Sequence, residues 1–286
     1  MKTRMTGWRA LLALVCACIL LGTYAQGSRF DRIYSFGDSL ADASNLGPFS
    51  NGPVWPQYLA GYLDLDLNDY AYGGALTGYE GSVLGFLGEV DLFLSEVAEA
   101  DITNRDLFTV VIGGNDFLDF YIGGGAYPIP GGIENTVAGV QRLLEAGARY
   151  MVVWTAPDLA VTPATAFLSP EEKAAVSMLS DAYNELLAAA LEDMATSYNC
   201  KLVIVDVNLA FRDMLANPSD YGLTNVEIPA YLGGVDPDSS LFWDEIHPTT
   251  YGHQLLAEFT LDTMLDELVP GQAIGLRMNV PGWVNY

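Results

Sequence analysis

The chain contains two histidines, His247 and His253, and the first follows Asp244 by three residues in the segment "FWDEIHPTT". Histidine is the side chain that most often transfers protons near neutral pH. A gap of three residues lets one loop present both side chains, so that the carboxylate of Asp244 holds the imidazole and stabilises its protonated form. His247 is therefore the candidate general base. We interpret His253, which falls in a predicted helix over residues 249–268, as a structural or surface residue.

A base of this kind activates a nucleophile, and Ser39 lies in the segment "SFGDSLAD", where an apolar run gives way to a predicted helix. At a strand-to-helix turn the hydroxyl of Ser39 projects above the edge of the sheet, and its backbone N–H is a helix-start donor. Glycine and aspartate form turns almost everywhere, so this segment alone does not distinguish a nucleophile from an ordinary turn. We assign the neighbouring Asp38 a capping or supporting role, because adjacent side chains diverge at such a turn.

Acyl transfer also needs donors for the oxyanion of the tetrahedral intermediate. In "YAYGGALTG", Gly73 and Gly74 follow a predicted strand, and the missing side chain lets a backbone N–H approach a substrate. In "VVIGGNDFLD", Asn115 follows another strand, where its carboxamide either supplies a donor or caps the helix that it begins. All these groups fall at the carboxyl ends of predicted strands, the edge where open α/β sheets bind ligands.

The elements that must position these residues alternate along the chain. Apolar runs rich in valine, isoleucine and aromatic residues predict buried strands at residues 32–36, 67–72, 107–112, 150–155 and 202–207. Each run is separated from the next by a segment with room for a helix. The pattern predicts an α/β fold, a three-layer α/β/α sandwich with a central parallel sheet of about five strands joined by right-handed crossovers.

The clearest helix starts at "SPEEKAAV", where Ser169 is the expected N-cap, Pro170 the first helical residue and Glu172 the partner in a capping box. Apolar residues follow at helical spacing, and we expect these to form its buried stripe: Ala175, Met178, Leu179, Ala182, Leu186, Ala190 and Met194. Residues 121–132 are too rich in glycine and proline for helix or strand, and residues 211–241 are also expected to be irregular. Such loops commonly shape binding sites.

The first 25 residues have the pattern of a secretory signal peptide. Three basic residues precede the apolar run 11–21, and small residues precede an expected cleavage after Ala25. This run of 11 residues is short of the roughly 20 that span a bilayer, which makes an uncleaved anchor the weaker interpretation. We expect a secreted or periplasmic protein, with residues 26–286 forming a single domain and no stable membrane insertion.

The chain carries a formal net charge of −24, which becomes −27 when the leader and its three positive charges are removed. So acidic a surface repels phosphate backbones and anionic headgroups, which argues against nucleic acid as a partner and against electrostatic membrane docking. Two of the three cysteines lie in the leader, so the mature chain keeps only Cys200. An intramolecular disulfide and a cysteine zinc cluster are therefore excluded, and we interpret Cys200 as a packing residue.

Taken together and in this order, the segments "FGDSLAD", "NDYAYGGA", "GGND" and "FWDEIHPT" resemble the four blocks of the GDSL family of SGNH hydrolases, over residues 33–252. The resemblance implies a flavodoxin-like domain in which Ser39 attacks an ester carbonyl. His247 is then the base and later the acid, and Asp244 orients it. The resemblance also implies three oxyanion donors: the backbone N–H of Ser39, the backbone N–H of Gly73, chosen over Gly74 by alignment of the block, and the side-chain amide of Asn115.

The family includes esterases, lipases, carbohydrate acetylesterases, phospholipases and acyltransferases, and the resemblance implies neither cofactor nor metal. No interfacial amphipathic helix stands out, so we expect action on short-chain or acetyl esters, with lipid and carbohydrate esters as the wider class of substrate. We also expect a monomer. Three aromatic residues and the loop 121–132 either line an acyl or sugar pocket or are ordinary core and surface residues: Phe49, Trp55 and Tyr58.

Two other classes of function are weighed against this one. A metal-dependent phosphoesterase also carries "GD" and "GND" fragments, but such sites draw on several histidines and carboxylates, and two histidines are few. A carbohydrate- or lipid-binding module that kept the fold and lost turnover is the third interpretation.

Overall fold

Five parallel strands form the central sheet in the computed structural model, which describes residues 29–268. The predicted leader, residues 1–25, lies outside this range. The spatial order of the strands is β2-β1-β3-β4-β5, which is the flavodoxin-like order. Their bounds are β1 (Arg32–Gly37), β2 (Asp66–Asp69), β3 (Asp106–Val111), β4 (Tyr150–Trp154) and β5 (Lys201–Val205). The predicted α/β class and the five-stranded parallel sheet are confirmed.

The edge strand β2 ends earlier than the predicted strand at residues 67–72. Its sequence "DLND" is polar, as suits an edge. The chain nevertheless stays bonded to β1 past Asp69, because Tyr70 N–H donates to Ser35 O at 2.8 Å and Tyr72 N–H donates to Gly37 O at 2.9 Å. This pairing brings the glycine turn after residue 72 beside the end of β1.

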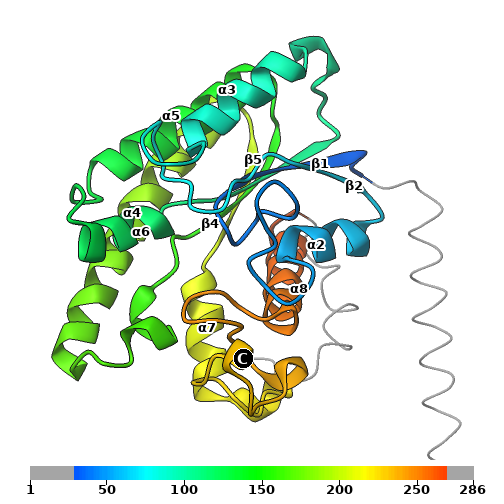
Figure 1. Ribbon diagram of the computed structural model, residues 1–286. Helices are drawn as coiled ribbons and strands as arrows, with labels where there is room; N and C mark the ends of the chain where they lie inside the picture. Colours follow the sequence, from blue (N-terminus) through cyan, green and yellow to red (C-terminus); the bar gives the residue numbers. More distant parts are fainter. Residues whose placement is uncertain (1–28, 269–286) are drawn as a thin grey trace, which may run out of the picture.

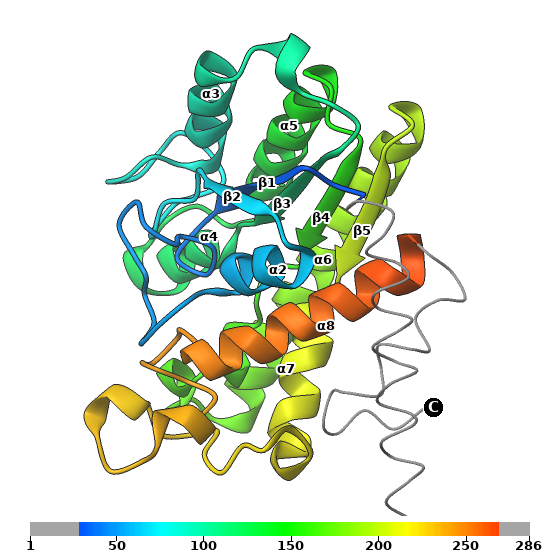
Figure 2. The same ribbon diagram turned by 90° about the vertical axis from the view of Figure 1, so that its right-hand side faces the viewer.

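Helices cover both faces of the sheet (Figure 1, Figure 2). One face carries α2 (Trp55–Leu63), α7 (Val207–Ala216) and α8 (Thr250–Leu268), and the other carries α3 (Phe86–Glu96), α5 (Gly131–Glu145) and α6 (Pro170–Ser197). The short helix α4 (Gly114–Leu118) follows β3 at the carboxyl end of that strand. Of the helices within residues 29–268, none is long and apolar enough to cross a membrane.

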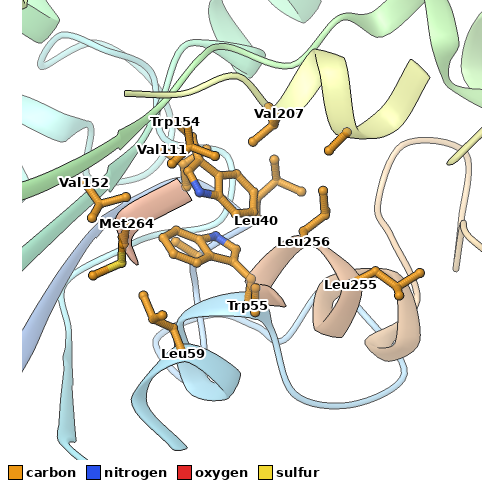
Figure 3. Close-up of a cluster of buried hydrophobic side chains, with 14 of the residues drawn as sticks. Leu40, Trp55, Leu59, Val111, Val152, Trp154, Val207, Leu255, Leu256 and Met264 are labelled. Atoms are coloured by element: carbon orange, nitrogen blue, oxygen red, sulfur yellow. The ribbon is translucent and has the colours of Figure 1, made fainter. Parts of the chain in front are cut away.

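A pair of stacked indole rings marks the core on the α2 side of the sheet. Trp55 opens α2 and stacks on Trp154 at the end of β4, with ring centroids 4.1 Å apart and planes 21° apart (Figure 3). The indole of Trp154 also donates to the hydroxyl of Thr260 on α8 at 3.0 Å. The Trp55 cluster includes Leu40, Trp55, Trp154, Phe211, Leu256 and Met264. The Phe117 cluster on the opposite side includes Phe36, Phe86, Phe108, Phe117, Leu159 and Tyr183.

Helix α6 begins as predicted but turns a different stripe inward. Ser169 and Glu172 form the capping box, with N–H to side-chain bonds of 2.8 and 3.2 Å. The predicted stripe is wrong for Met178 and Leu186, which are 72% and 53% exposed, whereas Leu179 and Met194 do pack against the core. The helix instead buries Val176, Ser180, Tyr183, Asn184, Leu187, Leu191 and Ala195. Asn184 is buried because its carboxamide pairs with both backbone groups of Ala156, at 2.8 and 3.0 Å.

The two segments predicted to be irregular are partly helical. Residues 211–216 complete α7, and short 3-10 turns occupy part of the stretch that follows. The glycine-rich segment at 121–132 begins inside a π-helical turn, Asp119–Gly123, and ends in the first turn of α5. Between these turns the chain is irregular, as its glycine and proline content predicts.

Cys200 precedes β5 and is a free thiol that packs against the Phe117 cluster. Burial raises the pKa of this thiol to about 11. Because the thiolate is the reactive form of cysteine, this surrounding suits the packing role predicted for Cys200.

Candidate active site

Ser39 lies on a tight turn directly after β1. Gly37 ends the strand with φ 137°, and a Cβ there would lie 2.0 Å from the carbonyl oxygen of Val111 on β3, so only glycine fits. Asp38 closes the turn: its N–H donates to Val111 O at 3.1 Å, and its carboxylate accepts the N–H of Leu40 at 3.0 Å. Asp38 thus supports the turn, but the helix predicted to begin at Ser39 is wrong: residues 39–41 form a turn, and the next described helix after β1 begins at Trp55.

A hydrogen-bonded chain joins the three residues predicted to act together. His247 Nε2 lies 2.8 Å from Ser39 Oγ, and His247 Nδ1 lies 2.7 Å from Asp244 Oδ2. Asp244 Oδ1 accepts the backbone N–H of His247 at 2.7 Å and that of Ile246 at 2.9 Å. Burial raises the pKa of the Asp244 carboxyl, but these hydrogen bonds outweigh it and hold the pKa below its ordinary value. An ionised Asp244 holds the proton on Nδ1 and leaves Nε2 to accept from the serine.

The loop that carries Asp244 and His247 is held by hydrogen bonds and packing from neighbouring residues. Trp243 N–H donates to His247 O at 2.8 Å, which narrows the loop into a hairpin. Ser50 Oγ donates to Pro248 O at 2.9 Å and ties the loop to the segment after the nucleophile turn. From that segment, Phe49 packs its ring against the imidazole, with centroids 5.5 Å apart. The imidazole is therefore held by packing as well as by its hydrogen bonds.

Asn115 supplies a side-chain donor at the neighbouring strand end. It lies in the first turn of α4, directly after β3, and lines the same cavity as Ser39 and His247. One hydrogen of its carboxamide is donated to Ala75 O at 3.0 Å, which orients the group and leaves the second hydrogen for a ligand. Within residues 29–268 the backbone N–H of Ser39 donates to no protein acceptor, so it is a second candidate donor.

Gly73, the predicted third donor, does not fit the structure. Its N–H is donated to Asp42 Oδ2 at 2.8 Å, and a Cβ at this position would lie 1.9 Å from the ring of Phe49. Gly74 has φ 87°, is exposed, and its N–H has no acceptor in the described part of the chain. Of the two glycines, only Gly74, the alternative that the sequence left open, has a backbone N–H that is not already donated to an acceptor in the described part of the chain. Glycine is needed at residue 73 for a different reason, to make room for Phe49.

A buried glutamate, which the sequence analysis missed, ties the two turns together. Glu89 on α3 is fully buried and accepts the N–H of Gly37 at 2.8 Å and that of Tyr72 at 3.2 Å. Each of these N–H groups lies two residues before a candidate backbone donor, Ser39 or Gly74. Burial raises the pKa of this carboxyl well above its ordinary value. A carboxyl on the otherwise apolar stripe of α3 was the available signal in the sequence.

A second buried carboxyl, that of Asp38, lines the cavity beside the nucleophile and is only 2% exposed. Burial raises its pKa from 3.8 to about 7, against the opposing effects of the Leu40 N–H and of His247. Asp38 is therefore largely neutral in mildly acidic solution. In that form it places no negative charge beside an oxyanion that forms at Ser39.

Of the two interpretations left open for the aromatic residues, the structure supports the second, because none of the three lines the cavity at Ser39. Trp55 lies in the core, and the hydroxyl of Tyr58 pairs with that of Thr250 at 2.8 Å. No residue of the loop 121–132 lines the cavity, and Ile122 in that loop is 81% exposed. The walls come instead from α4, from the turn after β4, from α7 and from the loop that carries His247.

The carboxylates around the site are engaged by the protein itself. Asp42 accepts the N–H groups of Asn45 and Gly73, and Asp69 accepts those of Ala43 and Ala71, at 2.8–3.1 Å. Within residues 29–268, no group of three or more His, Cys, Asp or Glu side chains is arranged to hold a metal ion. This donor set does not favour the metal-dependent phosphoesterase.

The strand order reverses between β1 and β3 (Figure 2). Ser39 and Asn115 follow these two strands. Open α/β sheets bind ligands at such a switch point. A serine–histidine–aspartate chain at this point defines the serine hydrolase class of site. The model of the GDSL-like Lipase/Acylhydrolase family matches residues 33–260, and the chain belongs to this family.

Proteins of known name are similar to the chain over most of its length. The chain is 30% identical to the esterase EstA of Pseudomonas aeruginosa, over 92% of this chain and 53% of that protein. It is also 30% identical to an acetylesterase of Thermothelomyces thermophilus, over 80% of this chain and 87% of that protein. A member of the lipolytic G-D-S-L family from Veillonella parvula shares the fold, with a TM-score of 0.50 at 15% identity, over 81% of this chain and 96% of that chain. The chain thus spans about half of the EstA esterase.

Proposed function

We propose that the protein hydrolyses carboxylic esters through an acyl-enzyme formed on Ser39. The observation that carries the proposal is the hydrogen-bonded chain from Ser39 through His247 to Asp244, at 2.8 and 2.7 Å. A serine hydroxyl is a weak nucleophile, and an adjacent imidazole activates it by taking its proton as the new bond forms. Membership of an esterase and lipase family supports the same chemistry.

In the first half-reaction, Ser39 Oγ attacks the carbonyl carbon of the ester while His247 Nε2 accepts its proton. Asp244 stabilises the imidazolium that results. The negative charge on the former carbonyl oxygen is shared among the carboxamide of Asn115 and the backbone N–H groups of Ser39 and Gly74. The bond to the alcohol oxygen then breaks, His247 returns the proton to that oxygen, and the acyl group stays on the serine.

In the second half-reaction, a water molecule replaces the alcohol. His247 accepts a proton from this water as its oxygen attacks the acyl carbon, and the same donors stabilise the second oxyanion. The bond to Ser39 Oγ breaks, the serine recovers its proton from His247, and the carboxylic acid leaves. The acidic surface of the protein, with a net charge of −24 for the whole chain, favours departure of the carboxylate product.

We assign the preferred substrates to esters with a short acyl group, such as acetyl esters. The acetylesterase of Thermothelomyces thermophilus, 30% identical over 80% of this chain, supports this choice. The net charge of the chain disfavours substrates that are themselves strongly anionic.

The test compares Ser39→Ala with the wild type on p-nitrophenyl acetate. Loss of the nucleophile is expected to lower kcat by about 10³-fold or more and to abolish labelling by a fluorophosphonate probe. Ser44→Ala, at an exposed serine on the same segment, is the matched control and is expected to keep both properties. Turnover that survives Ser39→Ala but disappears with a chelator would point to the metal-dependent alternative.

A further inference from the structure

The cavity beside Ser39 has one polar and one apolar side. Its volume is about 40 Å³, and Asp38, Ser39, Asn115 and His247 form the polar side. The apolar side is built by side chains from separate segments of the chain: Leu40, Leu118, Leu159, Val161, Phe211 and Ile246. A carbonyl group that reacts at Ser39 therefore has an apolar space directly next to it.

The apolar side lies where the two hydrophobic clusters meet beyond the sheet edge. Phe211 on α7 belongs to the Trp55 cluster, is 5% exposed and stacks on Phe242, with ring centroids 6.1 Å apart. Leu159 belongs to the Phe117 cluster on the opposite side of the sheet. Half-buried Val161 and Leu118 pack against the Trp55 cluster and the Phe117 cluster, respectively. The walls are thus fixed by the core.

Hydrogen bonds hold the 3-10 turn Leu159–Val161 in place. The hydroxyl of Thr162 donates to Leu159 O at 2.8 Å, which closes the turn. Ala164 N–H donates to Glu245 O at 2.8 Å and joins this segment to the loop that carries the acid and the base. The cavity is therefore formed before a substrate arrives.

The polar groups near the apolar side are already paired. The carboxylate of Asp158 accepts the N–H of Ala160 at 2.9 Å and the hydroxyl of Ser177 at 2.6 Å. It also faces the guanidinium of Arg212 at 3.3 Å. The hydroxyl of Thr162 donates its hydrogen bond to the backbone carbonyl of Leu159. A sugar ring in this space would leave its hydroxyls without partners, whereas an alkyl chain needs none.

We propose that this cavity is the acyl subsite and that it accepts unbranched aliphatic acyl groups of about two to four carbons. The proposal rests on the ester hydrolysis proposed above. A volume of about 40 Å³ holds about three water-sized spheres at roughly 10–15 Å³ each, and a methyl or methylene group is of similar size. The alcohol part of the ester stays outside, so this subsite selects the acyl group.

Val161 and Leu118 offer the sharpest test, because both line the cavity and neither is fully buried. Val161→Ala and Leu118→Ala enlarge the cavity, and Val161→Phe fills it. Leu209→Ala is the matched control, since Leu209 is 58% exposed on α7 and lies outside the cavity. Thermal unfolding is measured for each variant to establish that the variant is folded.

The measurement is kcat/KM for p-nitrophenyl acetate, butyrate, hexanoate and octanoate. For the wild type, we expect a gain of up to about fourfold for each added methylene as far as butyrate, and a loss of about tenfold or more between butyrate and octanoate. The two enlarging variants are expected to move the optimum to hexanoate or beyond. Val161→Phe is expected to leave acetate as the best substrate, and Leu209→Ala to match the wild type.

A wild-type profile that is flat or rises through octanoate would overturn the proposal. So would an optimum that stays at butyrate in both folded enlarging variants. Either result leaves ester hydrolysis by Ser39 intact, because all four esters share one reaction. Failure of the proposed function is a separate result, in which the wild type hydrolyses none of the esters and a fluorophosphonate does not label Ser39.

Discussion

His247 and His253 lie six residues apart and have opposite surroundings. His247 contacts both Ser39 and Asp244, whereas His253 is fully buried on α8 and accepts the N–H of Trp55 at 3.4 Å. Burial, with a smaller effect of His247, lowers the pKa of His253 to about 3. His253 therefore stays neutral near neutral pH and holds α8 against the start of α2. Of the two interpretations left open for it, structural rather than surface is correct.

Replacing each histidine separately tests which one is the base. His247→Ala is expected to lower kcat for p-nitrophenyl acetate by about 10³-fold or more, with KM changed little, because the imidazole acts in the transition state. Wild-type kcat is expected to fall in acid, where a base becomes protonated. His253→Asn is the control and is expected to lower the unfolding temperature while keeping kcat within a fewfold. Equal losses of kcat in the two variants would mean that His247 is not the base.

At the scale of elements, the site could be predicted because its residues mark the ends of strands. Ser39 and Asn115 each follow an apolar run and a glycine. This pattern alone predicts that both residues lie at the same edge of the sheet. The choice between Gly73 and Gly74 was not accessible in this way. It depends on Asp42, which lies far from residue 73 in the sequence and accepts the hydrogen bond of its backbone N–H.

The walls of the cavity and the buried side of α6 also could not be predicted from local sequence patterns. The cavity is lined by side chains from α4, α7 and two turns, and no local pattern marks these as neighbours. Trp55 was a candidate for the cavity wall, but it lies in the core because it stacks on Trp154 there. On α6, apolar residues occur on several sides, and the pairing of Asn184 with Ala156 decides which side is buried.

Through Glu89, helix α3 is hydrogen-bonded to the two turns that carry the proposed backbone oxyanion donors, Ser39 and Gly74. Glu89→Leu leaves the N–H groups of Gly37 and Tyr72 without this acceptor, and we expect kcat to fall about 10- to 100-fold with KM changed little. Glu89→Gln keeps one acceptor oxygen and is expected to recover part of the loss. The measurement is kcat and KM for p-nitrophenyl acetate, together with thermal unfolding.

Glu96→Leu is the matched control for this prediction, because Glu96 lies on the same helix, is exposed and bonds to the hydroxyl of Tyr70 at 3.1 Å. It is expected to keep the wild-type kcat. If Glu89→Leu lowers the unfolding temperature but leaves kcat unchanged, Glu89 stabilises the fold without positioning the donors.

For the whole molecule, buried carboxyls link stability to pH in an uncommon direction. Burial raises the pKa of Asp38 from 3.8 to about 7, that of Asp69 to about 6, and that of Glu89 well above its ordinary value. Between the unfolded and folded pKa values the folded state binds more protons than the unfolded state, so the free energy of unfolding falls as pH rises. For Asp38 the full effect is on the order of 4 kcal/mol, at about 1.4 kcal/mol per pH unit.

Surface charge also makes the free energy of unfolding fall as pH rises. The negative net charge increases in magnitude from acid to −24 at pH 7, and these charges repel one another more strongly in the compact folded state. Salt separates the two causes. Repulsion between exposed charges is largely screened at 1 M NaCl, where the Debye length is about 3 Å, whereas ionisation of a buried carboxyl is screened much less. A loss of stability between pH 4 and 7 that survives high salt is therefore assigned to the interior.

We expect the free energy of unfolding, measured by urea denaturation, to be lower at pH 8 than at pH 5 in both 0.1 and 1 M NaCl. Asp38→Asn keeps an acceptor for the N–H of Leu40 but cannot ionise, so it is expected to be more stable than the wild type at pH 8 and to depend less on pH. Asp66→Asn, at an exposed residue on β2, is the control and is expected to keep the wild-type pH dependence. If the pH dependence vanishes in 1 M NaCl, surface repulsion causes it. If it survives 1 M NaCl but is the same in Asp38→Asn as in the wild type, buried carboxyls other than Asp38 cause it.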